Sequence, residues 1–133
     1  MSKARCRVSL LVALAVLAAM VAGCDSGSPM GQVTGKVTLN GKPLPNAELE
    51  FQPVDNRPSS SGKTDAEGRY KVQYTSKKSG ALAGEHVVRI TTEQDASDDG
   101  KPAVPEKLPP KYNTKSQLKK TVKPGKQTID FEL

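Results

Sequence analysis

The stretch GQVTGKVTLNGKPL, residues 31–44, decides the fold of this chain. From Gly31 to Leu39, small and aliphatic residues occupy the odd positions and polar residues occupy the even ones. A period of two is typical of a β-strand that buries one face and exposes the other. Asn40-Gly41 follows directly and is a strong signal for a tight turn into a second strand.

The same alternation recurs to the end of the chain, and no segment after residue 30 keeps helical periodicity over three turns. The segments between the expected strands are rich in turn residues, including Pro124-Gly125 and a type I turn at 65–68 that a glycine closes. About seven short strands separated in this way predict an all-β fold, a single Ig-like or transthyretin-like β-sandwich. The expected strands are 31–39, 47–52, a short one beginning at 63–64, 69–74, 85–92, 117–122 and 129–133.

Two connections are expected to be irregular. Residues 55–62 are rich in Ser, Pro and Asn and are interpreted as a loop. Residues 92–111 are acidic at first and proline-rich later, and a loop of this length in a small domain is either functional or mobile. Tyr112 is expected to hold its end. The acidic side chains could offer oxygen ligands to Ca²⁺, but their spacing is not that of an EF-hand, and a solvated loop is favoured. They are Glu93, Asp95, Asp98 and Asp99.

The N-terminal segment has the pattern of a signal peptide. Lys3, Arg5 and Arg7 form a basic start, and residues 8–21 are apolar except for Ser9. A helix that spans a bilayer needs about 20 apolar residues, so this run is too short to cross one. A buried core helix is the alternative, and the flanking charges argue against it.

The residues that end this run, Val21-Ala22-Gly23-Cys24, resemble a bacterial lipobox, in which an aliphatic residue and two small residues precede an obligatory cysteine. The resemblance implies cleavage between Gly23 and Cys24, diacylglycerol on the Cys24 sulfur, and acylation (typically with palmitate) of the new N-terminus. Two or more acyl chains anchor a protein stably where a single chain does not. An ordinary secretory signal followed by a coincidental cysteine is the alternative.

The chain therefore divides into a lipoprotein signal peptide (1–23), a lipidated spacer (24–30) and one β-sandwich domain (31–133). We expect a location in the cell envelope, with the domain held on the periplasmic or cell-surface face of a membrane by Cys24. The sequence leaves open which membrane that is.

Composition excludes several classes of function. Three of the 20 basic residues lie in the signal peptide, so the remaining 110 residues carry 17 basic against 14 acidic side chains, a net charge of +3. Nucleic-acid binding needs a concentrated basic face, and no nucleic-acid partner is expected. The surplus lysines either keep the surface soluble or weakly attract anionic headgroups or acidic glycans. Cys6 lies in the signal peptide and Cys24 would carry lipid, which leaves the domain without a thiol for a disulfide, a metal or catalysis.

Candidate catalytic residues are few. His86 is the only histidine, and its parity with Val88 and Ile90 favours an inward position at the edge of the sandwich over a general base or metal ligand. The serines at 59–61 lack the Gly-x-Ser-x-Gly context of a hydrolase nucleophile and are interpreted as loop residues. We expect no catalytic, cofactor or metal site, and hence a protein that is not an enzyme.

Several motifs resemble a carboxypeptidase regulatory-like domain, which is a transthyretin-like β-sandwich. They are Gly35-Lys36-Val37 with Asn40-Gly41-Lys42-Pro43-Leu44, the run Ala47-Glu48-Leu49-Glu50-Phe51, and Thr64-Asp65-Ala66-Glu67-Gly68-Arg69-Tyr70. Residues 84–90 are similar to a later G-x-Y-x-V-x-I strand of that family, with His86 in place of the usual aromatic residue. Residues 108–112 and 129–133 look like the ending of small envelope lipoproteins from environmental Gram-negative bacteria. The resemblance covers roughly residues 31–133 and is specific for a fold, not for an activity.

The leading interpretation is a non-enzymatic, lipid-anchored envelope protein whose sandwich is a binding or structural module, with another protein or an envelope polymer as its partner. The alternative is a carbohydrate-binding module similar to starch-binding domains, which needs exposed aromatic rings beside polar groups. Tyr70, Tyr74 and Tyr112 are the candidates, although the parity of Tyr70 and Tyr74 with Val72 predicts that both are buried. An enzyme would require His86 to meet an arginine and a carboxylate in a pocket.

Overall fold

The structure, a computed structural model, describes residues 29–133. The predictions for the signal peptide, for cleavage after Gly23 and for lipid on Cys24 lie outside these residues. Within them, no helix is both long enough and apolar enough to cross a bilayer.

The described chain is all-β, as predicted, with one short 3-10 helix. Its strands are β1 (Met30–Leu39), β2 (Lys42–Pro43), β3 (Glu48–Pro53), β4 (Ser60–Lys63), β5 (Arg69–Lys71), β6 (Gln73–Thr75), β7 (Lys78–Ser79), β8 (Ala81–Leu82), β9 (Gly84–Thr91), β10 (Leu118–Val122), β11 (Gly125–Thr128) and β12 (Phe131–Glu132). The 3-10 helix, η1, spans Pro110–Tyr112. Several strands are short, so the predicted count of about seven corresponds to the longer extended segments.

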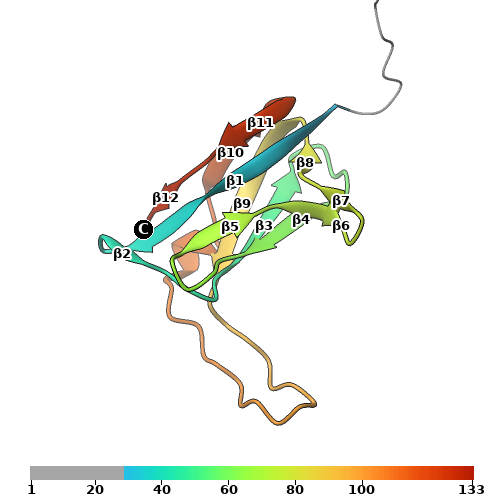
Figure 1. Ribbon diagram of the computed structural model, residues 1–133. Helices are drawn as coiled ribbons and strands as arrows, with labels where there is room; N and C mark the ends of the chain where they lie inside the picture. The colour runs from blue at the N-terminus through green and yellow to red at the C-terminus, as the bar shows by residue number, and fades with distance from the viewer. Residues whose placement is uncertain (1–28) are drawn as a thin grey trace, which may run out of the picture.

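Two sheets pack face to face as a sandwich (Figure 1). The first is built around β1, which pairs in parallel with β11 and β12 on one side and antiparallel with β2, β5 and β8 on the other. The second has the order β10-β9-β3-β4-β6-β7, and every pairing in it is antiparallel.

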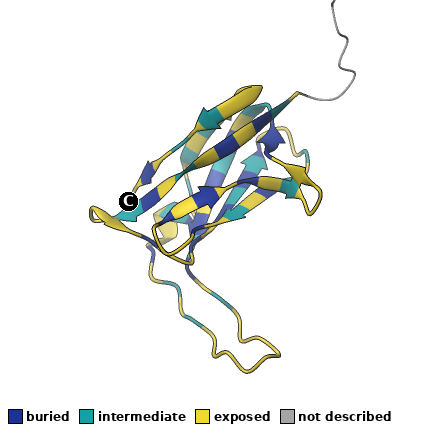
Figure 2. Cartoon of the chain, in the orientation of Figure 1, coloured by how far each residue is buried: buried dark blue, intermediate teal, exposed yellow. Residues whose placement is uncertain are grey.

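The core lies between the sheets, and Figure 2 shows buried and exposed positions alternating along the strands. Phe51, at the centre of the core, is 0 % exposed. Its ring centroid lies 6.3 Å from that of Tyr70 and 6.3 Å from that of Phe131. Each fully buried aliphatic or aromatic side chain contributes about 1.5–3 kcal/mol. The other buried hydrophobic residues of the core include Val33, Val37, Leu49, Val72, Val88, Ile90 and Val122.

Two predicted turns form as expected. Asn40 (φ 51°) and Gly41 (φ 79°) both have positive φ, as a two-residue hairpin turn between β1 and β2 requires. Asp65 Oδ1 accepts hydrogen bonds from the backbone N–H groups of Glu67 (3.0 Å) and Arg69 (2.9 Å), and Gly68 closes that turn at φ 75°.

The prediction of a loop over 55–62 is wrong at its end, because β4 begins at Ser60. Ser60 is buried opposite Phe51, and Ser61 pairs with Glu50. Serine and glycine carry little β-propensity, and this segment becomes a strand because the free edge of β3 offers it a hydrogen-bonding partner. Residues 76–84, which lie between two of the expected strands, similarly contain the short strands β7 and β8.

The C-terminal prediction also needs correction. Residues 125–128 were expected to connect the turn at 124–125 to the last strand, but they form β11 beside the start of β1. The last strand, β12, covers only Phe131–Glu132. The two short strands continue along the same edge of β1. Ile129 N–H donates to the Thr34 carbonyl oxygen between them (2.8 Å).

The long connection after β9 is an ordered arm that projects beyond the sandwich (Figure 1). Gln94 and Val104 exchange two backbone hydrogen bonds of 2.9 and 2.8 Å, which close the arm as an antiparallel pair. Tyr112 packs against the core just after the arm, in the position predicted to hold its end.

Candidate functional site

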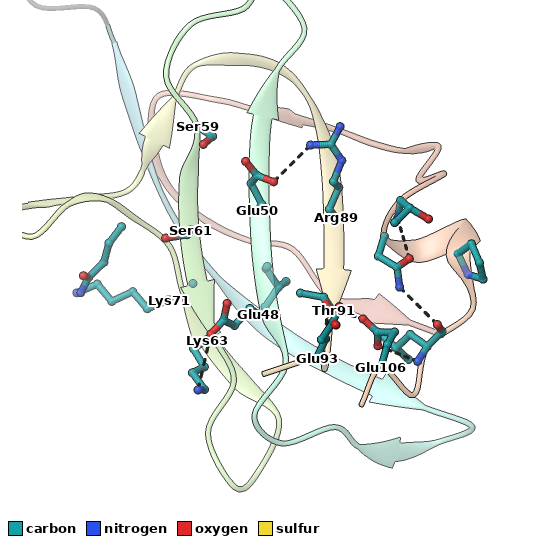
Figure 3. A pocket seen from close by; sticks show the side chains of 17 residues that line it. Glu48, Glu50, Ser59, Ser61, Lys63, Lys71, Arg89, Thr91, Glu93 and Glu106 are labelled. Atoms are coloured by element: carbon teal, nitrogen blue, oxygen red, sulfur yellow. Dashed lines mark hydrogen bonds and ion pairs between the residues drawn. The ribbon is translucent and has the colours of Figure 1, made fainter. Parts of the chain in front are cut away.

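An open groove of about 1330 Å³ lies on the outer face of the second sheet (Figure 3). Strands β3, β4 and β9 form its floor, and the segment that contains η1 forms one wall. The acidic and basic residues that line it are Glu48, Glu50, Glu93, Glu106, Lys63, Lys71 and Arg89, and the other polar ones are Ser59, Ser61, Gln73, Thr91, Asn113 and Thr114.

Strand register produces this lining. Because Leu49 and Phe51 point into the core, the residues between and before them, Glu50 and Glu48, point outward. The register places Glu48 between Lys63 and Thr91 across the sheet. It likewise places Glu50 between Ser61 and Arg89.

Two ion pairs cross the floor of the groove. Glu48 Oε1 lies 3.8 Å from Lys63 Nζ, and Glu50 Oε2 lies 3.4 Å from Arg89 Nη1. All four side chains are about half exposed, so each pair contributes about 0–1 kcal/mol to stability. Such weak pairs can exchange their partners for the charges of a ligand at little cost.

Two further charges in the groove have no counter-ion. Within residues 29–133, neither Lys71 nor Glu93 has an oppositely charged group within 4.0 Å. The groove therefore presents charges of both signs, some already paired and some free, and suits a polar ligand of mixed charge.

Glu106 fixes the wall of the groove. Its carboxylate accepts hydrogen bonds from the Thr91 hydroxyl, from the backbone N–H (3.0 Å) and hydroxyl (2.6 Å) of Thr92, and from the backbone N–H groups of Lys107 and Leu108 (both 2.9 Å). Burial alone would raise its pKa, but the hydrogen bonds outweigh burial and lower the pKa of Glu106 to about 2. This one side chain ties the return of the arm to the end of β9.

His86 lies inward, as predicted. It is 0 % exposed, its Nδ1–H donates to the Gly84 carbonyl oxygen (3.0 Å), and its Nε2 has no partner within the described residues. Burial lowers the pKa of His86 and the Arg57 charge acts in the same direction, whereas the Gly84 hydrogen bond and the Asp55 charge oppose them. An arginine and a carboxylate thus lie near the ring, but the ring is closed to a substrate in this conformation.

The tyrosines do not form a stacking platform. Tyr70 is 4 % exposed and its hydroxyl donates to the Ile129 carbonyl oxygen. Tyr112 is half-buried against the core, with Lys111 Nζ 4.8 Å from its ring centroid. Tyr74 was predicted to be buried but is only half-buried. No tyrosine lines the groove.

The acidic side chains of the arm do not gather into a metal site. Across residues 29–133, no three His, Cys, Asp or Glu side chains lie where they could hold one ion together. Asp99 is engaged instead by the Ser97 hydroxyl and by Lys101 Nζ (2.9 Å).

The groove was not predicted from the sequence. Ser59 and Ser61, interpreted as loop residues, line it, and Arg89 was not assigned a role. The outward charges of 47–52 and 85–92 were a visible signal, but the pairing register that brings them together was not.

Comparison with known proteins adds little to this description. No protein-family model and no curated protein matches the sequence. A crystal structure of a DUF3823 family protein from Parabacteroides merdae is 16 % identical with a TM-score of 0.42, and the match covers 80 % of this chain and 46 % of that one. A 9R-lipoxygenase from Cyanothece is 23 % identical with a TM-score of 0.37, over 78 % of this chain and 16 % of that one.

This chain spans less than half the length of either structure, and neither likeness carries a functional argument. Fold and groove together define the class of this protein as an all-β sandwich with a polar, mixed-charge groove on one sheet.

Proposed function

We propose that this chain is a non-enzymatic envelope lipoprotein, anchored through Cys24, whose carboxypeptidase regulatory-like sandwich binds an extended segment of another envelope protein in the groove. The observation that carries the proposal is the row of crossing ion pairs on the groove floor, Glu48 with Lys63 and Glu50 with Arg89. Each pair sets one positive and one negative group side by side on adjacent strands. The two pairs lie two residues apart along β3, about 6.8 Å, which is also the distance between neighbouring side chains on one face of an extended peptide.

A peptide ligand fits this lining better than a glycan does. Recognition of sugars commonly uses an exposed aromatic ring, and no aromatic residue lines the groove. Charged side chains of a partner could instead replace the weak internal pairs, and Lys71 and Glu93 would supply additional unpaired charges. Electrostatic complementarity of this kind contributes specificity and association rate more than affinity.

The proposal is tested by photo-crosslinking in intact cells. A photoreactive amino acid is placed at Ser61, which is exposed in the groove, and in a second strain at Thr128, which is exposed on the first sheet. We expect a discrete protein adduct from position 61 and none at the same mass from position 128.

Charge variants supply the specificity control. Neutralising the groove pair with Glu50→Gln and Arg89→Gln should weaken the adduct, whereas Lys36→Gln with Glu132→Gln on the first sheet should leave it intact. Equal adducts from both positions, or an adduct indifferent to the groove variant, would contradict the proposal. A polysaccharide adduct from position 61 would favour the carbohydrate-binding alternative.

A further inference from the structure

The sandwich has two distinct ends, which the strand register identifies. At the Met30 end, Gly31 of β1 pairs with both Ala81 and Gly125, and Pro53 pairs with His86. This end includes the loops at 54–59, 76–77 and 123–124. The opposite end carries the arm that follows β9 (Figure 1).

The Met30 end carries uncompensated positive charge. Four of its lysines are exposed and, within residues 29–133, have no carboxylate within 4.0 Å. They are Lys77, Lys78, Lys123 and Lys126. Among residues 29–133, the two acidic residues at this end are already paired, Asp55 with Arg57 (2.7 Å) and Glu85 with Lys119 (3.3 Å).

The arm at the opposite end is acidic. Glu93, Asp95 and Asp98 are exposed there and, in the part of the chain that the structure describes, have no cation within 4.0 Å. The four free charges at the Met30 end are thus all positive, whereas the arm, residues 92–109, carries five carboxylates against two lysines.

The Met30 end must also lie close to the membrane if Cys24 is lipidated. Pro29 is already part of the folded domain, since its carbonyl oxygen accepts a hydrogen bond from Ala83 N–H (2.8 Å). Only residues 24–28 then separate the lipid from the domain, and their greatest possible reach is about 18 Å. Screening at physiological salt limits electrostatic attraction to about 8 Å. A spacer of this length lets the lysines at this end approach the headgroups to within that distance, whereas the arm at the opposite end can stay outside it.

A single exposed apolar side chain supports the same orientation. Val54 is 52 % exposed, lies in the loop at 54–59, and is held by a hydrogen bond from its N–H to the Glu85 carbonyl oxygen (3.1 Å). An apolar group beside lysines suits the boundary between headgroups and acyl chains.

Building on the lipid anchor proposed above, we infer that the Met30 end of the sandwich is a membrane-facing surface that binds anionic phospholipid headgroups through Lys77, Lys78, Lys123 and Lys126. Attraction at this end and repulsion of the acidic arm then orient the domain with the arm pointing away from the bilayer. The groove on the second sheet opens to the side and stays accessible.

Lysine footprinting of the purified lipoprotein tests the inference. The full mature protein is reconstituted into vesicles of phosphatidylcholine alone, or of equal parts phosphatidylcholine and phosphatidylglycerol, and its lysines are acetylated and quantified by mass spectrometry. In the anionic vesicles we expect the four lysines to react at least about threefold more slowly, while Lys42 and Lys115 at the opposite end keep their rates. High salt should remove the protection, because screening shortens to about 3 Å at 1 M.

Charge-matched variants separate this surface from a general effect of net charge. Lys123→Gln with Lys126→Gln should reduce the protection of Lys77 and Lys78, whereas Lys42→Gln with Lys115→Gln should not. Equal rates at both ends in anionic vesicles would overturn the inference alone, provided that the same spectra show lipid on Cys24. Absence of lipid on Cys24 would overturn the proposed anchor and this inference together.

Discussion

Replacing Glu106 with Gln should destabilise the fold, because it removes an ionised carboxylate that five hydrogen-bond donors surround. In the folded protein the carboxylate gathers five donors, and its pKa falls from an ordinary 4.5 to about 2. By linkage, this difference corresponds to about 3 kcal/mol of stability at neutral pH. Because water screens a side chain that is only partly shielded, we expect about half of that, about 1.5 kcal/mol. The amide of Gln keeps the shape but turns one acceptor into a donor that faces other donors.

The sign of the pH dependence follows from the depressed pKa. The contribution of Glu106 is complete above about 4.5 and is lost as the pH falls toward about 2, where the folded protein also takes up the proton. The free energy of unfolding of wild type and Glu106→Gln should therefore differ by about 1.5 kcal/mol at neutral pH and converge at the acid end.

Urea titrations followed by circular dichroism measure this difference, since the chain has no tryptophan for fluorescence. Glu93→Gln is the matched control, because Glu93 lies at the same end of β9, is exposed, and accepts no side-chain hydrogen bond within residues 29–133. That variant should shift the free energy of unfolding by less than about 0.5 kcal/mol. A Glu106→Gln deficit that is equally large at neutral and acid pH would show that the loss of stability does not come from the ionised carboxylate.

Two further predictions concern stability. Gly35→Ala should destabilise the fold by about 2–3 kcal/mol in urea titrations, since the new Cβ would lie 1.8 Å from the Ile129 carbonyl oxygen. Gly41→Ala, whose Cβ meets open space at φ 79°, should cost only about 1 kcal/mol from backbone strain, and equal costs would contradict the packing argument. Because burial lowers the pKa of His86, the unfolded chain takes up the proton first, and stability falls as the pH drops below 6.5. His86→Phe should make the free energy of unfolding less dependent on pH between pH 7 and pH 5, and parallel pH profiles for wild type and variant would count against this.

The sequence predicted those features that depend on neighbouring residues in the chain, namely strand faces and tight turns. The alternation from Gly31 to Leu39 gave the central strand its buried face, and Asn40-Gly41 set the hairpin turn that follows. His86 was placed inward by its parity with neighbours on the same strand, and its burial confirms that placement.

What could not be predicted depends on partners distant in the chain. Ser60 and Ser61 become a strand only because the edge of β3 pairs with them. Glu50 and Arg89 meet through a register that residue types do not encode. Glu106 acquires its role when the arm folds back on the end of β9, more than a dozen residues earlier in the chain.

Metabolic labelling with a fatty acid tests whether Cys24 is the lipid anchor of this sandwich. Cells that express the full chain are grown with a clickable fatty acid, and the labelled protein is compared between wild type, Cys24→Ala and Cys6→Ala. Cys6 is the only other cysteine and lies in the predicted signal peptide, which makes it the matched control. If Cys24 carries the lipid, wild type and Cys6→Ala should be fully labelled and Cys24→Ala should not be labelled. Equal labelling of all three, or of none, would contradict lipidation at Cys24.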